Sequence, residues 1–442
     1  MSKFAQKVGR IPKVLYEHKK KTVFFSFCGY LAGDWVYRWS RNQTIRAEYS
    51  KIARIFGEKT ISPEDRPRRI FVLINTDANL RNVVDNFTKN ALPLFHLAGI
   101  SVDIVKAKDE KQMEQLAGAL DQQEADAIYV VGGDGAIGKV VSGIFKNREK
   151  SILPIGFYPG GYDNAFLKRI APEVFANSQD VRAACESAMA VIEEQKRNLY
   201  AFEVKNAEND EIIEYGLSDL SMGWNRQIEE VRKKMWYFGG LRRRWAYIWE
   251  MCKRSPSPIE LQIEYEQPCS GCQKCRPKPI ILAPTWRWWH ILTGTPKYRN
   301  SDAERDFTGI INEKCGEWQK MEAKGSEILI ENQQNTDHSS LRLRISAADS
   351  SRLSVISDGF SARIAENHVG SSRNPDYYPI DISANSVRFK IAPEISDYIR
   401  KMWLSSIPTD KSAEICEKWW EVRGSLKKLE CFLPKNVRLQ EF

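Results

Sequence analysis

The residues best suited to chemistry form a glycine-rich turn after a short apolar run. Residues 126–136 read Asp-Ala-Ile-Tyr-Val-Val-Gly-Gly-Asp-Gly-Ala, and a helix-like pattern follows. Adjacent glycines allow a tight turn and a close approach of a ligand to the backbone. The start of the next helix leaves N–H groups unpaired, and these attract phosphate. Gly132, Gly133, Asp134 and Gly135 therefore predict a nucleotide-phosphate site, in which Asp134 holds a metal ion or orients a hydroxyl.

A second glycine-rich turn follows one helix later. Residues 152–165 read Ile-Leu-Pro-Ile-Gly-Phe-Tyr-Pro-Gly-Gly-Tyr-Asp-Asn-Ala, a pattern of strand, Gly/Pro loop and helix. One such loop alone is often only a strand-to-helix turn. Two loops about one helix apart fit a parallel sheet, which places both at the carboxyl ends of neighbouring strands.

The segments around these loops predict the sheet that carries them. Residues 70–74 form a continuous apolar run, typical of a buried parallel strand, and a turn follows at residues 75–77. The further pattern is a helix at 80–97, a strand at 102–105, a helix at 109–120 and a strand at 127–131. This alternation predicts a doubly wound α/β nucleotide-binding domain over residues 67–200.

The second half of the chain has a different texture. Short apolar segments, separated by polar turns, predict a mainly β second domain over residues 201–395, a β-sandwich. Residues 293–325 are polar and are expected to form an irregular insert. Residues 396–442 are expected to be a C-terminal tail of mixed helix and coil.

Length and charge set broad limits on function. The chain has 442 residues, which predicts two domains, and a net charge of +9 with a pI near 8.9. This charge suits an anionic partner such as phospholipid, nucleotide or nucleic acid. No nucleic-acid fold motif and no Walker-type Gly-Lys-Ser/Thr loop occurs, so we expect no nucleic-acid partner.

The N-terminal residues 1–66 read as a basic flank, a membrane-associated segment and a linker. Lysines and arginines dominate the first residues, as in mitochondrial targeting segments or flanks that meet anionic lipid. Residues 23–37 are apolar and aromatic, but the run is short and Asp34 interrupts it. A membrane-associated or interfacial segment and a buried helix both remain open. The same choice, core packing or interfacial surface, applies to the aromatic-basic stretches at 233–249 and 286–292.

Three cysteines lie within seven residues of one another. Cys269, Cys272 and Cys275 have the two-residue spacing that lets successive thiolates face one metal, which makes Zn²⁺ reasonable. A disulfide with one free thiol is equally compatible with this spacing. A fourth ligand is not evident from the sequence. The candidates are Cys252, Cys315 and His290.

With both glycine loops in hand, the chain resembles the diacylglycerol kinase catalytic-domain superfamily, as a divergent member most similar to its mitochondrial acylglycerol kinase branch. Residues 22–57, 89–106 and 236–241 carry the similarity to that branch. The resemblance implies an α/β nucleotide domain followed by a β-sandwich domain. The family's nucleotide motifs match Asn75, Gly132, Gly133, Asp134, Gly135, Gly156, Pro159, Gly161 and Asn164, with Asp134 as the catalytic residue.

The function implied by the resemblance is phosphoryl transfer to a lipid. ATP and Mg²⁺ would phosphorylate monoacylglycerol or diacylglycerol, giving lysophosphatidic or phosphatidic acid, and catalysis would rest on positioning and charge neutralisation. The resemblance places the protein at the mitochondrial inner membrane, on the intermembrane-space side. It also implies an alternative, a catalytically weak or inactive membrane scaffold such as a subunit of the inner-membrane carrier-protein translocase.

Several positions depart from the family motifs. Ala136 stands where the family has Thr, and Lys139 stands where it has Glu. Tyr162 and its neighbours replace the family's Gly-Thr-x-Asn-Asp pattern, and the turn after Asn75 lacks the usual Pro and Gly. The region near 376–381 offers no clean match to the family's acidic general base. These departures leave the kinase and scaffold interpretations both open.

Overall fold

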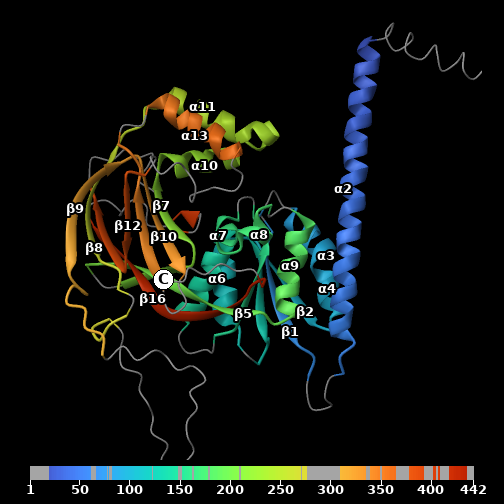
Figure 1. The fold of residues 1–442 in the computed structure, drawn as a ribbon, viewed down its shortest axis with the longest axis horizontal. Coiled ribbons are helices and arrows are strands. Elements are labelled where there is room, and N and C mark those ends of the chain that lie inside the picture. The colour runs from blue at the N-terminus through green and yellow to red at the C-terminus, as the bar shows by residue number, and fades with distance from the viewer. Residues whose placement is uncertain are drawn as a thin grey trace, which may run out of the picture.

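The structure is a computed structural model, and it describes residues 19–435 with internal gaps. The gaps are residues 61–65, 77, 79–81, 122, 148–151, 162–163, 178–179, 209–210, 270, 276–308, 335–338, 349–350, 365–377, 393–401, 405–406 and 409–417. Figure 1 shows a mainly β unit beside an α/β unit, with one long helix at the outer edge of the α/β unit.

The α/β unit is built on four parallel strands in the order β2-β1-β3-β4. They are β1 (Arg69–Asn75), β2 (Ser101–Ala107), β3 (Ala127–Gly132) and β4 (Ile155–Pro159). All residues of β3 and β4 are buried, because helices cover both faces of the sheet. The strands predicted at 70–74, 102–105 and 127–131 are confirmed.

The two faces of this sheet belong to separate apolar cores. Val72 and Tyr129 point into a core with α3 (Val83–Asn90), α4 (Leu92–Leu97) and α9 (Val181–Ile192). Leu73 and Val130 point into the opposite core with α5 (Glu110–Ala119) and α6 (Asp134–Lys146). This alternation follows from the pleat of a strand buried on both sides.

The helix predicted at 80–97 is two helices in the structure. The break falls at Ala91, between α3 and α4, and Pro93 lies in the first turn of α4. Proline lacks an N–H and is accepted in a first helical turn, where that N–H has no intrahelical partner. A helix therefore restarts there, although the apolar spacing continues across the break.

The second unit contains two sheets that share one core. One sheet has the order β12-β11-β10-β7-β14-β15, and the other continues the first sheet as β16-β13-β8-β9, with β5 and β6 beside β16. The strands are β5 (Lys196–Asn206), β6 (Glu211–Gly216), β7 (Asp219–Gly223), β8 (Ile259–Glu266), β9 (Trp318–Gly325), β10 (Glu327–Gln334), β11 (Ser339–Ile345), β12 (Ile380–Ala384), β13 (Ser386–Ile391), β14 (Met402–Leu404), β15 (Ile407–Pro408) and β16 (Trp419–Phe432).

Strand β16 corrects the expectation of a C-terminal tail. Its end pairs in parallel with β4 at Cys431 and Phe432, and its length pairs antiparallel with β5 and β13. The register against β5 shifts between Gly424 and Lys428, so the alternation of apolar and polar residues is interrupted there and its strand pattern is obscured. In the same way, β9 occupies the end of the segment 293–325 that was expected to be irregular.

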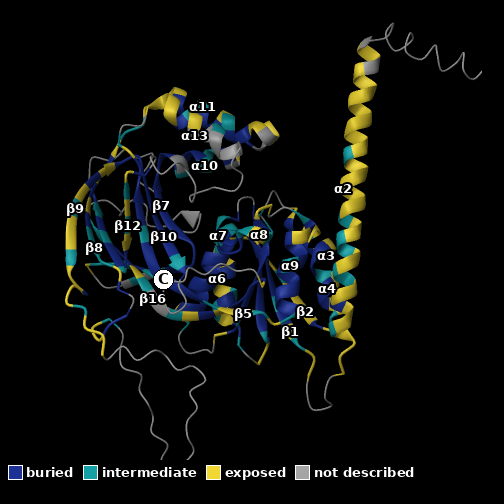
Figure 2. Cartoon of the chain, viewed as in Figure 1, coloured by how far each residue is buried: buried dark blue, intermediate teal, exposed yellow. Residues whose placement is uncertain are grey.

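Helix α2 (Lys19–Gly57) packs on the α/β unit only through its C-terminal half. Ala53 is fully buried, and Arg41 binds Asp180 at the start of α9. The N-terminal half is exposed around its whole circumference and projects beyond the α/β unit (Figure 2). Its exposed apolar residues are Val23, Phe24, Phe25, Phe27, Tyr30, Leu31, Trp35, Val36, Tyr37 and Trp39. Among the described helices, none is long and apolar enough to cross a membrane.

A helical group caps one end of the β unit (Figure 1). It contains α10 (Trp224–Lys234), η2 (Trp236–Leu241), α11 (Arg242–Lys253) and α13 (Arg352–Ile364). Leu241, Trp245, Ile248 and Cys252 share one helical face. Three of them are exposed and Ile248 is half-buried, whereas Tyr247 and Met251 pack inward. Core packing of this face is therefore wrong as an interpretation. The second aromatic stretch, residues 286–292, lies outside the described residues.

Candidate functional site

The two glycine loops meet at the carboxyl ends of neighbouring strands, as predicted. Strands β3 and β4 are parallel partners, with Gly132 opposite Pro159, and the Gly160 N–H donates to the Gly132 carbonyl at 3.0 Å. A Cβ on Gly161 would lie 2.6 Å from Gly133 Cα. The loops can approach this closely only because both positions lack a side chain.

Asp134 joins the second loop to the first. It is the first residue of α6, its side chain is buried, and its two carboxylate oxygens accept the N–H groups of Ala165 at 2.8 Å and Phe166 at 3.1 Å. These amides begin the short helix α7 (Ala165–Ile170). The carboxylate therefore acts as a cap across the two loops, and this gives Asp134 a positioning role in addition to the predicted chemical one.

Asn164 holds the second loop in shape. Its backbone lies in the left-handed region at φ 47° and ψ 46°, which asparagine tolerates better than most residues. Its amide oxygen accepts the Gly161 N–H at 2.9 Å, and its amide nitrogen donates to the Gly161 carbonyl at 2.9 Å. Asn164 thus folds the loop against Gly133 and is itself almost fully buried.

The remaining predicted site residues differ in how deeply they are buried. Asn75 ends β1, is buried, and its amide reaches Glu110 at 3.4 Å. Gly133 and Gly135 are only partly buried, so a ligand can approach their backbone. Gly156 lies inside β4, where an added Cβ would meet the Tyr129 ring at 2.5 Å. Gly156 therefore has a packing role. It lies three residues before Pro159, which ends β4 at the second glycine loop.

The start of helix α6 has no side-chain cap. Its N-cap residue is Gly133, which has no side-chain oxygen to accept the first N–H groups of the helix. The first-turn amides of a helix have no intrahelical partner, and together with the helix dipole they favour a bound phosphate. This helix start, between the two loops, is the arrangement predicted for the nucleotide phosphates.

The family departures have a structural explanation. Ala136 is buried directly under the first loop, where its Cβ would lie 2.6 Å from a Cβ placed on Gly132. Lys139 forms ion pairs with Glu214 of β6 and, at 3.6 Å, with Glu114 of α5. The reversed charge at Lys139 is therefore neutralised by carboxylates on two neighbouring elements. The third departure, Tyr162, lies outside the described residues.

The second unit contributes charged residues that the sequence reasoning missed. Arg226 of α10 donates to Asp219 at 2.7 Å and to Ser221 Oγ at 2.7 Å. Burial would lower the pKa of the Arg226 guanidinium, but the carboxylates of Asp219, Glu327 and Asp134 together raise it. Asp134 is among these charges, so Arg226 lies in the electrostatic environment of the first glycine loop.

Asp219 and Arg169 extend this contact between the units. Burial would raise the pKa of the Asp219 carboxyl, but Arg226 and Arg169 hold it below its usual value. Arg169, at the end of α7, also donates to the Ser218 carbonyl at 3.3 Å and lies 3.5 Å from Glu331 of β10. Asp219 begins β7 and Arg226 follows on α10, but no sequence spacing linked either residue to the glycine loops.

Residues 376–381 correspond to the region of the family's acidic general base, and the described acid among them, Asp381, is paired with an arginine. Asp381 accepts two hydrogen bonds from Arg342, at 2.7 and 2.6 Å. These bonds, opposed by burial and assisted by the charge of Arg342, lower the pKa of the Asp381 carboxyl. A carboxylate held in this way is a weak base. Asp376 lies outside the described residues.

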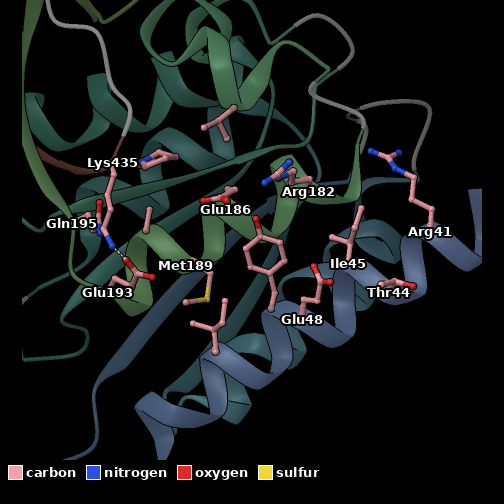
Figure 3. Close-up of a pocket in the computed structure, with 15 residues that line it drawn as sticks. Arg41, Thr44, Ile45, Glu48, Arg182, Glu186, Met189, Glu193, Gln195 and Lys435 are labelled. Atoms are coloured by element: carbon pink, nitrogen blue, oxygen red, sulfur yellow. Dashed lines mark hydrogen bonds and ion pairs between the residues drawn. The ribbon is translucent and has the colours of Figure 1, made fainter.

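A groove of about 820 Å³ lies elsewhere, between α2 and α9 (Figure 3). Tyr49 donates a hydrogen bond to Glu186 there, and burial, followed by this bond, raises the pKa of the Tyr49 phenol. The groove lines the face where α2 is attached, opposite the core that contains α6. Its contacts with Arg41 and Arg182 belong to the attachment of α2, so we do not assign it to the nucleotide.

The predicted cysteine cluster forms and has a fourth member. The thiol sulfurs of Cys269, Cys272, Cys275 and Cys315 all lie within 4.8 Å of one another. Cys315 was one of the three candidates for the fourth position. Cys252 is exposed on α11, and His290 lies outside the described residues.

Comparison with known proteins supports the family assignment. Residues 69–200 match the diacylglycerol kinase catalytic domain. The uncharacterized protein F52C9.3 of Caenorhabditis elegans is 60% identical over 440 residues, which cover 100% of both chains. Mitochondrial acylglycerol kinase of Xenopus laevis is 28% identical over 266 residues, 59% of this chain and 60% of that one. The human acylglycerol kinase is 27% identical over 260 residues, 58% of this chain and 60% of that one.

The matched region spans about three fifths of each acylglycerol kinase. A crystal structure of a diacylglycerol kinase from Bacillus anthracis str. Sterne aligns with 85% of this chain and 100% of its own, at 10% identity and a TM-score of 0.45, too low to carry an argument. Residues 69–200 therefore form a diacylglycerol kinase catalytic domain, and this part of the chain is related to the acylglycerol kinases.

Proposed function

We propose that this protein is an ATP-dependent lipid kinase that phosphorylates the free hydroxyl of monoacylglycerol or diacylglycerol. The products would be lysophosphatidic and phosphatidic acid. The observation that carries this proposal is the contact between Gly133 and Gly161, which brings two glycine-rich loops and a helix start without a side-chain cap to one edge of the sheet. Such a site offers backbone N–H groups to phosphate oxygens.

The residues present fit a magnesium nucleotide. When bound, Mg²⁺ would neutralise phosphate charge, and it is usually held by phosphates, waters and one or two carboxylates. Asp134 supplies the carboxylate at the meeting point of the two loops, where its oxygens accept the N–H groups of Ala165 and Phe166. Arg226 adds positive charge from the second unit. These groups position the phosphates and stabilise charge, which is the main contribution of a protein to phosphoryl transfer.

The lipid would reach the site from a membrane surface, and two exposed aromatic regions support this. One is the N-terminal half of α2, whose aromatic residues follow basic Lys19–Lys21. The other lies on η2 and α11, where Phe238 stacks on Trp245 at 5.5 Å and both are exposed. Figure 1 shows both regions extending toward the same side of the molecule. Tryptophan and tyrosine favour the headgroup depth of a bilayer, and basic residues favour anionic lipid.

We also propose a mitochondrial location at the inner membrane, on the intermembrane-space side. Two of the relatives named above, from Xenopus laevis and human, are mitochondrial acylglycerol kinases, and the basic N-terminus is compatible with import. Fluorescence of a C-terminal tag, together with protease protection in isolated mitochondria and in mitoplasts, tests both parts. Protection in intact mitochondria with loss of protection in mitoplasts is the expected result.

The kinase assay should use the full-length chain with radiolabelled ATP, Mg²⁺ and acylglycerol in mixed micelles. We expect labelled lysophosphatidic or phosphatidic acid from the wild type and a much weaker signal from Gly133→Ala, since the new Cβ would lie 3.1 Å from Gly161 Cα. Gly309→Ala is the matched control, because an added Cβ there meets nothing within 4 Å. Equal product from all three proteins, or none from the wild type, would contradict the proposal.

The second candidate is a catalytically weak membrane scaffold, such as a subunit of the inner-membrane carrier-protein translocase. The specific observation is that Ala136, beneath the first loop, lacks the hydroxyl of the family's Thr, and that Lys139, where the family has Glu, forms ion pairs with Glu114 and Glu214. Nucleotide binding separates the two candidates. A ligand that binds only the folded state raises the melting temperature, so Mg²⁺–ATP should raise it for a kinase and leave it unchanged for a scaffold.

A further inference from the structure

Four cysteines from two distant parts of the chain surround one point in the β unit. Cys269, Cys272 and Cys275 follow β8, and Cys315 precedes β9. Their sulfurs all lie within 4.8 Å of one another, and the pairs Cys272–Cys275 and Cys269–Cys275 are each 3.7 Å apart. We propose that these four thiolates hold one structural Zn²⁺ ion.

The sulfur spacing agrees with a tetrahedral site. Zinc–sulfur bonds are about 2.3 Å long, and the edge of a tetrahedron is about 1.63 times the distance from its centre to a corner. Ligands around one zinc should therefore be about 3.8 Å apart, close to the 3.7 Å found for two pairs. A disulfide would instead require a pair at about 2.05 Å and would leave its other two neighbours without a role.

The surroundings of the sulfurs resemble the second shell of a metal site. The Cys272 N–H points at Cys275 Sγ at 3.3 Å, and the Asn312 amide points at Cys269 Sγ at 3.5 Å. Donors aimed at sulfur stabilise thiolates and fix their orientation. Cys269, Cys272 and Cys315 are buried, and a closed site without access for water is typical of structural zinc.

The position in the fold indicates what the ion would stabilise. Strands β8 and β9 are antiparallel neighbours, and Glu266 pairs with Trp318 where the hairpin opens. A long stretch of sequence separates Cys275 from Cys315, and both cysteines lie beside this end of the β8–β9 pair. A cross-link across the base of a long connection lowers the entropy of the unfolded chain. The Gln273 N–H bond to the Ile310 carbonyl, at 3.0 Å, also ties the two sides together.

The proposal is independent of the kinase activity, and metal analysis tests it directly. We expect full-length protein, purified from zinc-supplemented cells and dialysed, to contain about one zinc per chain. Cys272→Ser should lower this content roughly tenfold or more, since it removes a buried ligand. Cys252→Ser is the matched control, because Cys252 is exposed on α11 outside the cluster.

A second measurement uses the wild type alone, in case Cys272→Ser does not fold. Titration with a mercurial reagent should release zinc to a metallochromic dye as the four cluster thiols react, and loss of zinc should increase protease cleavage between residues 276 and 314. Iron in place of zinc, no bound metal, disulfides among the four cysteines in freshly purified protein, or equal zinc in both serine variants would each overturn the proposal.

Discussion

Replacing Asp134 by asparagine separates the capping role of this residue from its chemical role. In the wild type each carboxylate oxygen accepts one buried or half-buried N–H, from Ala165 and Phe166. Asparagine retains one oxygen and turns an NH₂ group toward the other N–H. A hydrogen bond to a charged group contributes about 1.5–3 kcal/mol, and an unsatisfied buried donor costs about 1–3 kcal/mol.

From these terms we expect Asp134→Asn to lower the free energy of local opening at the start of α7 by about 2–4 kcal/mol. Since every 1.4 kcal/mol is tenfold, amide exchange in residues 165–170 should become about 30 to 700 times faster. Hydrogen–deuterium exchange with mass spectrometry measures this segment directly. It avoids a global unfolding free energy, which is poorly defined for a protein with more than one unit.

The matched control is Asp109→Asn. Asp109 is also an N-terminal cap, accepting the Gln112 N–H at 2.7 Å, but it is exposed, and asparagine caps a helix as well as aspartate does. Exchange in α5 should therefore change little. If Asp134→Asn leaves exchange in residues 165–170 within about threefold of the wild type, the carboxylate does not hold the second loop and the capping argument fails.

Three further results are expected. Gly161→Ala should lower the melting temperature and weaken nucleotide binding, because the new Cβ would lie 2.6 Å from Gly133 Cα. Overpacking of this kind typically costs about 1–3 kcal/mol. An unchanged melting temperature together with unchanged nucleotide affinity would contradict the close contact. Lys139→Glu should lower the free energy of local opening of α6 by about 3 kcal/mol or more, measured as faster hydrogen–deuterium exchange in residues 134–146. Adding Glu214→Lys should recover part of this loss, and additive effects would show that the pair does not couple. The pKa of Asp219 is lowered in the folded chain, so its carboxylate stabilises the fold above about pH 4 and loses this effect as the pH falls through its folded pKa. The melting temperature of the wild type should therefore fall more steeply than that of Asp219→Asn between about pH 5 and pH 3.

Much of the α/β unit could be predicted because its information is local. Buried parallel strands appear as short apolar runs, and the glycine turns that follow them mark the carboxyl edge of the sheet. The meeting of Gly133 with Gly161 follows from the order of two adjacent strands. Even there, the continuous apolar spacing hid the break at Ala91.

The remaining parts of the site depend on contacts between distant segments. Nothing near Asp134 in the sequence shows that its carboxylate would face α7, or that Arg226 would contribute charge from the other unit. Cys315 could be named only as one of three candidates, since a single cysteine has no spacing pattern of its own. From the sequence, Lys139 could be read only as the loss of the family's Glu, because its ion pairs with Glu114 and Glu214 join segments that are far apart along the chain.

The position of β16 has a consequence for how the chain folds during synthesis. The sheet of the α/β unit is completed beside β4 by Cys431 and Phe432, which leave the ribosome more than two hundred residues after β4 itself. Contacts of such long sequence separation form slowly. The apolar edge of β4 must therefore remain uncovered until Cys431 and Phe432 have been synthesised. In nascent chains and in late truncations this edge should be exposed to chaperones. A chain truncated before residue 419 should therefore fail to accumulate, although its α/β sequence before that point is intact.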